Sequence, residues 1–336
     1  MYPRRFVAGA ALPPSWDLGA VLDFGRQGGA SVFDYTDVNV NLAENLLAPG
    51  DWAIRDQGAR GTCNAFAVVA AEELVRYRRD PRDPVMPLSE EQFYASIRKI
   101  PPACVGINLT AKQLAKQSDT GTTYLAQAAK ALVDFGICRA DLLPYQNKDF
   151  DIGFATETVP ESAMTDAAAR RLLPGQLTHN IIDIKVGSPP KDTVWVDPID
   201  SSVSDIFIQK LLDGLPVVAS FAILSGGGQA SWHGPEARWW GKVRYPRGSK
   251  LETLQSVAGH TVCIVGFVAD VTSQTDGWFL LRNSVGRSKF AYQYRHDPHK
   301  PRAPASGYGY VSVDDVNTYC WEYLMRSNAQ DAMPIA

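Results

Sequence analysis

QGARGTCNAF, residues 57–66, joins a loop with two glycines to the start of a helix. Apolar residues then recur at spacings of three and four as far as Arg79, which predicts an amphipathic helix that begins at or near Cys63. At the first turn of a helix, unpaired backbone N–H groups and the helix dipole favour a thiolate. Cys63 is therefore a candidate nucleophile, and the amide of Gln57 can supply a hydrogen-bond donor to an oxyanion beside it.

A cysteine nucleophile usually has an imidazole partner, and the chain has five histidines. His260 stands at the head of a predicted strand, 261–268, which is a rigid mount. The other four lie in loop-like sequence: His179, His233, His296 and His299. Asn283 directly follows a second predicted strand, 277–282, and its side-chain oxygen can accept the imidazole N–H. Cys63, His260 and Asn283 together form a candidate triad.

The rest of the chain predicts helices first and strands afterwards. Ser89 is expected to cap a helix, with Gln92 returning the bond in a capping box. Another helix is expected over 123–134, ending at Gly136. Irregular structure with one short helix near 163–173 is expected from residue 145 to about 200, and strands are expected over 216–224, 261–268, 277–282 and 308–313. This order of elements is typical of the α+β class.

Five motifs, taken together and in order, resemble the papain-like cysteine peptidases of clan CA, and the segment 12–18 resembles bacterial members. The motifs are Gln57-Gly58-x-x-Gly61-x-Cys63-x-Ala65-Phe66, Leu88-Ser89-Glu90-Glu91-Gln92, Gly259-His260-Thr261-Val262 with Gly266-Phe267, Arg282-Asn283-Ser284-x-Gly286, and Gly307-Tyr308-Gly309-Tyr310. The resemblance implies one peptidase domain over 51–330, with a helical lobe at about 51–200 and an antiparallel β-barrel-like lobe at about 201–325. The substrate cleft is expected between the lobes, and residues 1–50 are expected to form an extension packed on the body.

The resemblance also implies roles for individual residues. Cys63 and His260 would form an ion pair, and Asn283 would orient the imidazole. Gln57 and the backbone N–H of Cys63 would hold the oxyanion. Four residues would contact the substrate peptide: Gly61, Gly121, Thr122 and Gly259. No metal ion and no organic cofactor are expected.

Three positions depart from the family pattern. Arg60 replaces a cysteine that is disulfide-bonded in secreted members, and Asn64 replaces the aromatic residue after the nucleophile. Val285 replaces the tryptophan that shields the bond between the histidine and the asparagine. A wetter and weaker bond is therefore expected, unless another aromatic ring, from Trp278 or Phe290, covers it.

Composition excludes several classes of protein. The 336 residues include 33 Lys or Arg and 36 Asp or Glu, a formal charge of −3, which gives no electrostatic footprint for nucleic acid or an anionic membrane. No apolar run approaches the roughly 18 residues of a membrane span. Five scattered cysteines without CxxC spacing signal neither a dense disulfide framework nor a zinc site. A reducing compartment such as the cytoplasm is expected.

The sequence leaves regulation and the exact reaction open. We expect that the long inhibitory propeptide of many relatives is missing, so that either a separate inhibitor or immunity protein holds the enzyme in check or its substrate is narrow. The same expectation motivates the hypothesis of delivery as an effector into another cell. The first functional hypothesis is a cysteine endopeptidase that acts on proteins or peptides. The same acyl-enzyme would also serve a transglutaminase, a deamidase or a peptide ligase. A weakly active binding protein with the same fold is the third alternative.

Overall fold

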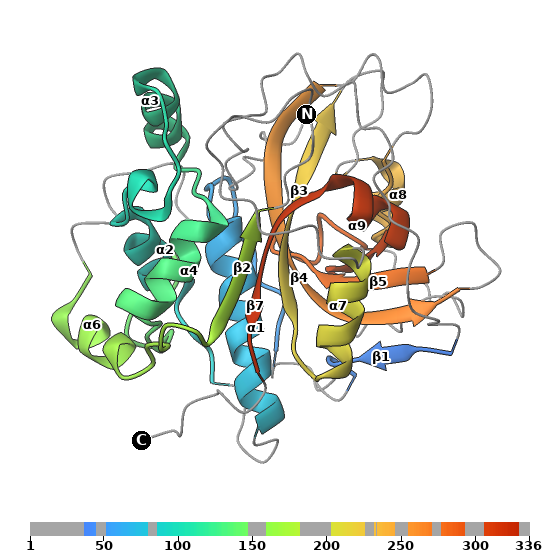
Figure 1. Ribbon diagram of the computed structural model, residues 1–336, viewed down its shortest axis with the longest axis horizontal. Coiled ribbons are helices and arrows are strands. Elements are labelled where there is room, and N and C mark those ends of the chain that lie inside the picture. Colours follow the sequence, from blue (N-terminus) through green and yellow to red (C-terminus); the bar gives the residue numbers. More distant parts are fainter. Residues whose placement is uncertain are drawn as a thin grey trace.

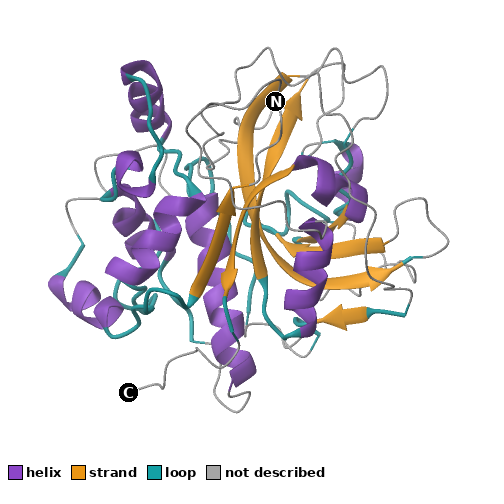
Figure 2. Ribbon diagram, viewed as in Figure 1, coloured by secondary structure: helices purple, strands orange, loops and turns teal. Residues whose placement is uncertain are grey.

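The structure is a computed structural model that describes residues 37–44, 52–79, 86–146, 159–181, 203–225, 232, 234–245, 255–270, 277–292 and 306–328. Most of the predicted extension, and His233, His296 and His299, lie outside these ranges. In the described part, one side of the molecule consists mainly of helices, and the other side contains most strands together with three short helices (Figure 1). Figure 2 shows the same separation by element type.

Helix α1 (Cys63–Arg79) begins at the predicted nucleophile and contacts both sides of the molecule. It packs against helices α2 (Glu90–Arg98) and α4 (Leu125–Asp134), and also against strands β3 (Val217–Ser225) and β4 (Gln255–Ala269). Every residue from its start to Val75 is buried, because neighbours surround it on more than one face. The helix predicted from the 57–66 stretch is confirmed.

The helical side also contains the 3₁₀ helix η2 (Pro102–Val105) and helices α3 (Ala111–Thr120) and α6 (Glu161–Ala168). Ser89 caps α2 as predicted, since its side chain accepts a hydrogen bond from the backbone N–H of Gln92. The prediction of a capping box is wrong, because the Gln92 side chain accepts a hydrogen bond from the Cys138 N–H and donates one to the Ser96 hydroxyl. Helix α3 was not predicted, because its sequence AKQLAKQSDT carries no apolar stripe.

The sheet is antiparallel and runs in the order β2-β7-β3-β4-β5-β6, with β1 (Asn39–Asn41) also paired to β4. The remaining strands are β2 (Leu177–Ile181), β5 (Gly277–Arg282), β6 (Tyr308–Ser312) and β7 (Cys320–Arg326). Within the described residues β2 and β6 form the two edges of the sheet, which is not closed into a barrel. The predicted α+β class, with helices and an antiparallel sheet, is confirmed. His179 lies on β2 rather than in the loop that was expected.

Three short helices pack around the sheet: α7 (Val203–Leu212), α8 (Pro235–Trp240) and α9 (Val313–Tyr319). One hydrophobic core cluster includes residues of α1, α2, α4 and the sheet, so the two sides of the molecule share their interior. Among the residues that the structure describes, no helix combines the length and the apolar character that crossing a bilayer requires.

Candidate active site

His260 and Asn283 meet at the end of a strand pair. His260 lies on β4 and Asn283 directly follows β5, the strand that pairs with β4 through Cys263 and Arg282. His260 Nε2 lies 2.8 Å from Asn283 Oδ1. His260 is fully buried and Asn283 is 5% exposed, so this hydrogen bond is shielded from water and is not the wet contact that Val285 led us to expect.

The hydrogen bonds around Asn283 determine the tautomer of the imidazole. Asn283 Oδ1 also accepts a hydrogen bond of 2.8 Å from the backbone N–H of Ser284. A backbone N–H can only donate, so the atom facing both partners is the amide oxygen. His260 Nε2 must therefore be the donor to Asn283. In the neutral ring the lone pair then lies on Nδ1, which is the nitrogen able to take a proton from a thiol.

Ser284 connects Asn283 to the candidate oxyanion donor. Its hydroxyl donates to Gln57 Oε1 at 2.5 Å, while Gln57 Nε2 donates to the carbonyl of Arg60 at 2.9 Å. These bonds fix which end of the buried Gln57 amide carries the N–H groups. Ser284 belongs to one of the sequence motifs, but the sequence predicts no role for it, because its partner Gln57 lies 227 residues away.

The loop before the nucleophile runs alongside the segment that carries Asn283. The backbone N–H of Gln57 donates to the Ser284 carbonyl at 2.7 Å, and Asp56 and Val285 form an antiparallel bridge. Cys63, the first residue of α1, is fully buried. Because the neighbouring Asn64 accepts a hydrogen bond from Thr261, the segments that carry Cys63 and His260 also lie side by side.

Arg60 stands where the papain-like pattern has a cysteine, and it links the nucleophile loop to α2 through an ion pair. Its guanidinium forms an ion pair with Glu91 through both terminal nitrogens, and both side chains are buried. The rings of Tyr94 and Tyr145 lie 5.3 and 5.1 Å from the guanidinium carbon. Two-point contact with a carboxylate and stacking on aromatic faces are features that suit arginine and not lysine.

Tyr145 supports the same loop and was not singled out from the sequence. Its hydroxyl donates to the Gln57 carbonyl at 2.7 Å and lies 3.0 Å from the hydroxyl of Thr62. The ring packs edge-on against Phe66, with 4.7 Å between centroids. Tyr145 therefore contacts the loop on both sides of Arg60 and the first turn of α1.

Two of the predicted substrate contacts lie together. A Cβ atom on Gly61 would meet the Thr120 carbonyl oxygen at 3.0 Å, so the nucleophile loop packs directly on the segment that carries Gly121 and Thr122. Gly121 has φ of +66° and its carbonyl accepts from the Tyr94 hydroxyl at 2.7 Å. Gly259 lies on β4 directly before His260 and is buried. The role of all four in binding a peptide stays a prediction.

Trp232 is the aromatic residue that the structure places against His260. The two rings meet edge to face, with 4.9 Å between centroids. The indole N–H of Trp232 lies 2.9 Å from the Tyr245 hydroxyl and 3.3 Å from the Ala222 carbonyl. The sequence instead indicated Trp278 or Phe290, because both lie closer along the chain to Asn283.

Of the other four cysteines, Cys138, Cys263 and Cys320 are buried and Cys104 is exposed. Burial raises the pKa of Cys138 to about 11 and that of Cys263 to about 12. Burial also raises the pKa of Cys320 far above that of an ordinary thiol. Because the thiolate is the nucleophile, these three groups are inert near neutral pH. In the described ranges, no cluster of three or more His, Cys, Asp or Glu side chains is arranged to hold a metal ion.

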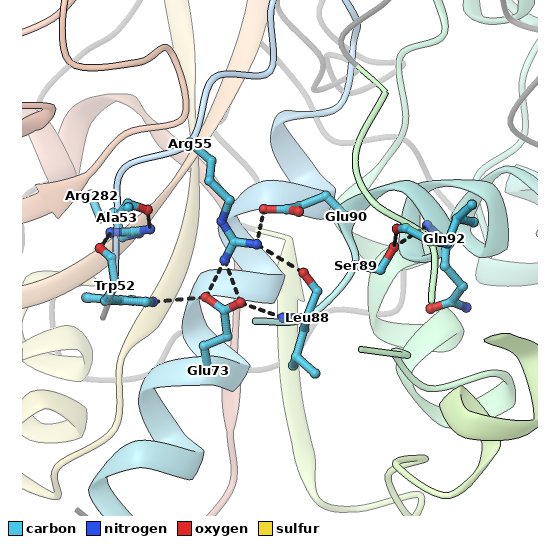
Figure 3. A network of polar contacts seen from close by, with 10 residues as sticks. Trp52, Ala53, Arg55, Glu73, Leu88, Ser89, Glu90, Gln92 and Arg282 are labelled. Carbon is cyan, nitrogen blue, oxygen red and sulfur yellow. Dashed lines mark hydrogen bonds and ion pairs between the residues drawn. The ribbon is translucent and has the colours of Figure 1, made fainter. Parts of the chain in front are cut away.

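A buried charge network connects α1 with α2 (Figure 3). Glu73 of α1 accepts hydrogen bonds from the Trp52 indole N–H at 3.0 Å and from the Leu88 backbone N–H at 2.7 Å, and it pairs with Arg55. Arg55 also pairs with Glu90, at 2.7 Å. Burial raises the pKa of Glu90 to about 7, against the opposing attraction of Arg55. One arginine thus holds two buried carboxyl groups between α1 and α2.

Among the solved structures that resemble this one, two illustrate the similarity at low sequence identity. The first is Xylellain, a cysteine protease from Xylella fastidiosa, with a TM-score of 0.58 and 19% identity over 98% of this chain and 99% of that one. The second is procathepsin B S9 from Trypanosoma congolense, with a TM-score of 0.50 and 14% identity over 94% and 85%. No protein-family model and no curated protein sequence matches the chain. The overall similarity covers nearly the whole chain, and the protein therefore has the papain-like fold.

Proposed function

We propose that the protein is a cysteine peptidase that cleaves peptide bonds through Cys63, His260 and Asn283. In this proposal, His260 Nδ1 takes the thiol proton and the Cys63 sulfur attacks the carbonyl carbon of the scissile bond. The imidazolium then protonates the leaving amine, which departs with the C-terminal part of the peptide. A water molecule, deprotonated by the same nitrogen, hydrolyses the thioester and regenerates the thiol.

The bond between His260 Nε2 and Asn283 Oδ1 is the observation that carries this proposal. A buried histidine that only filled space would need one satisfied nitrogen and no particular tautomer. Here Ser284 fixes the oxygen of Asn283, Asn283 fixes the N–H of His260, and Nδ1 is left as the basic nitrogen. This is the tautomer in which Nδ1 can act as a general base in the proposed reaction.

Gln57 and the start of α1 support the stabilisation of an oxyanion. One N–H of the Gln57 amide donates to the Arg60 carbonyl, and the proposed hole uses the second N–H together with the backbone N–H of Cys63. Donors of this kind stabilise the tetrahedral intermediate more than the planar substrate. Removing one of them typically lowers kcat by about 10²–10³-fold.

The test compares the wild type with Cys63→Ala on a degenerate peptide library at pH 7 under reducing conditions, with products identified by mass spectrometry. Cys104→Ser is the matched control, because Cys104 is exposed and distant in sequence from the loop. Cleavage by the wild type and by Cys104→Ser, but not by Cys63→Ala, is the expected result.

Two further variants test the assigned roles. Gln57→Ala is expected to lower kcat by about 10²-fold, in line with the loss of one oxyanion donor. Asn283→Ala is expected to lower kcat while leaving alkylation of Cys63 measurable. Cleavage that persists in Cys63→Ala would refute the proposal, and so would Cys63-dependent changes in mass of uncut peptides, which would indicate acyl transfer or deamidation.

A further inference from the structure

Asn64 directly follows the proposed nucleophile, and its side chain is fully buried. Its Nδ2 donates to the backbone carbonyl of Thr123 at 2.8 Å and to the hydroxyl of the same residue at 2.9 Å. Its Oδ1 accepts a hydrogen bond of 2.5 Å from the hydroxyl of Thr261. Both polar ends of the amide are therefore bonded, to partners on opposite sides of the molecule.

The direction of these hydrogen bonds follows from the chemistry of the groups. The Thr261 hydroxyl has one proton, which it donates to Asn64. The Ser220 hydroxyl lies 2.8 Å from the Thr261 oxygen, so Ser220 must donate to Thr261. A directed chain therefore runs from Ser220 through Thr261 and Asn64 to Thr123, and we call these four residues the Asn64 bridge.

Three of the four members of the Asn64 bridge are chain neighbours of residues with a proposed role in the reaction. Asn64 follows Cys63, Thr261 follows His260, and Thr123 follows Thr122. Neighbouring Cα atoms are 3.8 Å apart and joined by a rigid peptide unit. A fixed bridge therefore restricts the placement of nucleophile, base and substrate-binding segment relative to one another.

We propose that Asn64 is a positioning residue that holds Cys63, His260 and the segment at Thr122 in the arrangement that the reaction needs. This inference rests on the proposed peptidase function. An aromatic residue at this position would fill the space, but no aromatic side chain offers both an acceptor for Thr261 and a pair of donors for Thr123. In this chain, hydrogen bonding replaces that packing, and buried hydrogen bonds impose a direction that apolar contacts lack.

The experiment measures the reactivity of the Cys63 thiol, which needs no substrate. In a Cys104→Ser background, the rate constant for alkylation by iodoacetamide is followed from pH 4 to pH 9. Thr261→Val removes the hydroxyl and keeps the shape of the side chain, whereas Thr261→Ser keeps the hydroxyl. Asn64→Ala and the double variant Asn64→Ala/Thr261→Val complete a double-mutant cycle. Circular dichroism and thermal unfolding establish that each variant is folded.

The expected result is a loss of about tenfold or more in alkylation rate at pH 6 for Thr261→Val and for Asn64→Ala, because each breaks a buried hydrogen bond. The double variant is expected to lose little more than either single variant, and Thr261→Ser to stay within about threefold of the parent. The pH profile of the damaged variants is expected to shift toward that of an ordinary thiol. Peptide cleavage is expected to fall in parallel.

The possible failures are distinguishable. A Thr261→Val profile that matches the parent would overturn the role of the Asn64 bridge, even if the parent cleaves peptides. Equal damage in Thr261→Ser and Thr261→Val would also overturn it, since packing rather than the hydroxyl would then matter. A parent whose Cys63 reacts rapidly at pH 6, with rates that depend on the bridge, but that cleaves no peptide would support the bridge and refute the proposed peptidase.

Discussion

Replacing Glu90 by Gln tests the buried charge network, because it removes a carboxyl group whose ionisation the fold opposes. Glu90 is 2% exposed and shares its partner Arg55 with Glu73. Burial raises its pKa from 4.5 to about 7. Glutamine has nearly the shape of the protonated acid and keeps a carbonyl oxygen for Arg55.

The size of the effect follows from proton linkage. Between pH 4.5 and pH 7 the folded protein keeps a proton on Glu90 that the unfolded chain has lost. The unfolded state binds fewer protons in this window, so this group makes stability fall as pH rises and stay level above pH 7. A shift of one pKa unit corresponds to 1.36 kcal/mol, so ionisation of Glu90 lowers the free energy of unfolding by about 3 kcal/mol at pH 8.

Urea unfolding of the wild type and Glu90→Gln at pH 5, 6, 7 and 8 measures this difference. The variant is expected to match the wild type within about 1 kcal/mol at pH 5 and to exceed it by about 3 kcal/mol at pH 8. Glu161→Gln, at an exposed position on α6, is the control and is expected to follow the wild-type curve. A difference that does not change with pH would refute the reasoning. If the wild type instead becomes more stable to urea than the variant above pH 7, the attraction of Glu90 to Arg55 outweighs the cost of its burial.

Three other changes test the surroundings of the candidate active site. Arg60→Met is expected to lower the free energy of unfolding by about 3–5 kcal/mol, because it leaves the buried Glu91 without its cation, and Arg60→Met/Glu91→Leu should recover most of the loss in urea unfolding. Gly121→Ala is expected to lower the free energy of unfolding by about 1–2 kcal/mol or more, because φ is +66° and a Cβ would lie 2.6 Å from the Tyr94 hydroxyl. If adding Tyr94→Phe restores the whole loss, backbone strain is not its cause. Trp232→Leu is expected to lower kcat/KM for peptide cleavage more than tenfold, because the imidazole loses its edge-to-face neighbour; an unchanged kcat/KM in a folded variant would contradict this role.

The sequence predicted those parts of the fold that depend on local patterns. Helix α1 and β5, which precedes Asn283, lie where periodicity and motifs predicted them. The strand predicted over 261–268 is the second half of a longer strand, β4, so that His260 lies within the strand and not at its head. The open edge of the sheet was missed, because strand pairing at its ends depends on contacts between distant segments. Helix α3 was missed because it lacks an apolar stripe.

The candidate site shows the same limit. The residues of the proposed triad were found by motif, but their supporting contacts were not. Asn64 and Val285 looked like losses, because each replaces an aromatic residue of the family pattern. In the structure Asn64 bonds a partner 197 residues away, and an aromatic ring from residue 232 reaches His260. Such partners join segments that no local pattern connects.

Because an ion pair and not a disulfide links Arg60 to Glu91, the nucleophile loop, if it were opened, would close again without a redox reaction. A disulfide at this position, once reduced, closes again only when an oxidant takes up two electrons. Arg60 and Glu91 need no such reagent, since the pair reforms whenever the loop returns to α2. Closure is then a conformational step alone, and its rate and equilibrium are independent of the thiol–disulfide potential of the surroundings. The same loop geometry is therefore available in oxidising and in reducing solution.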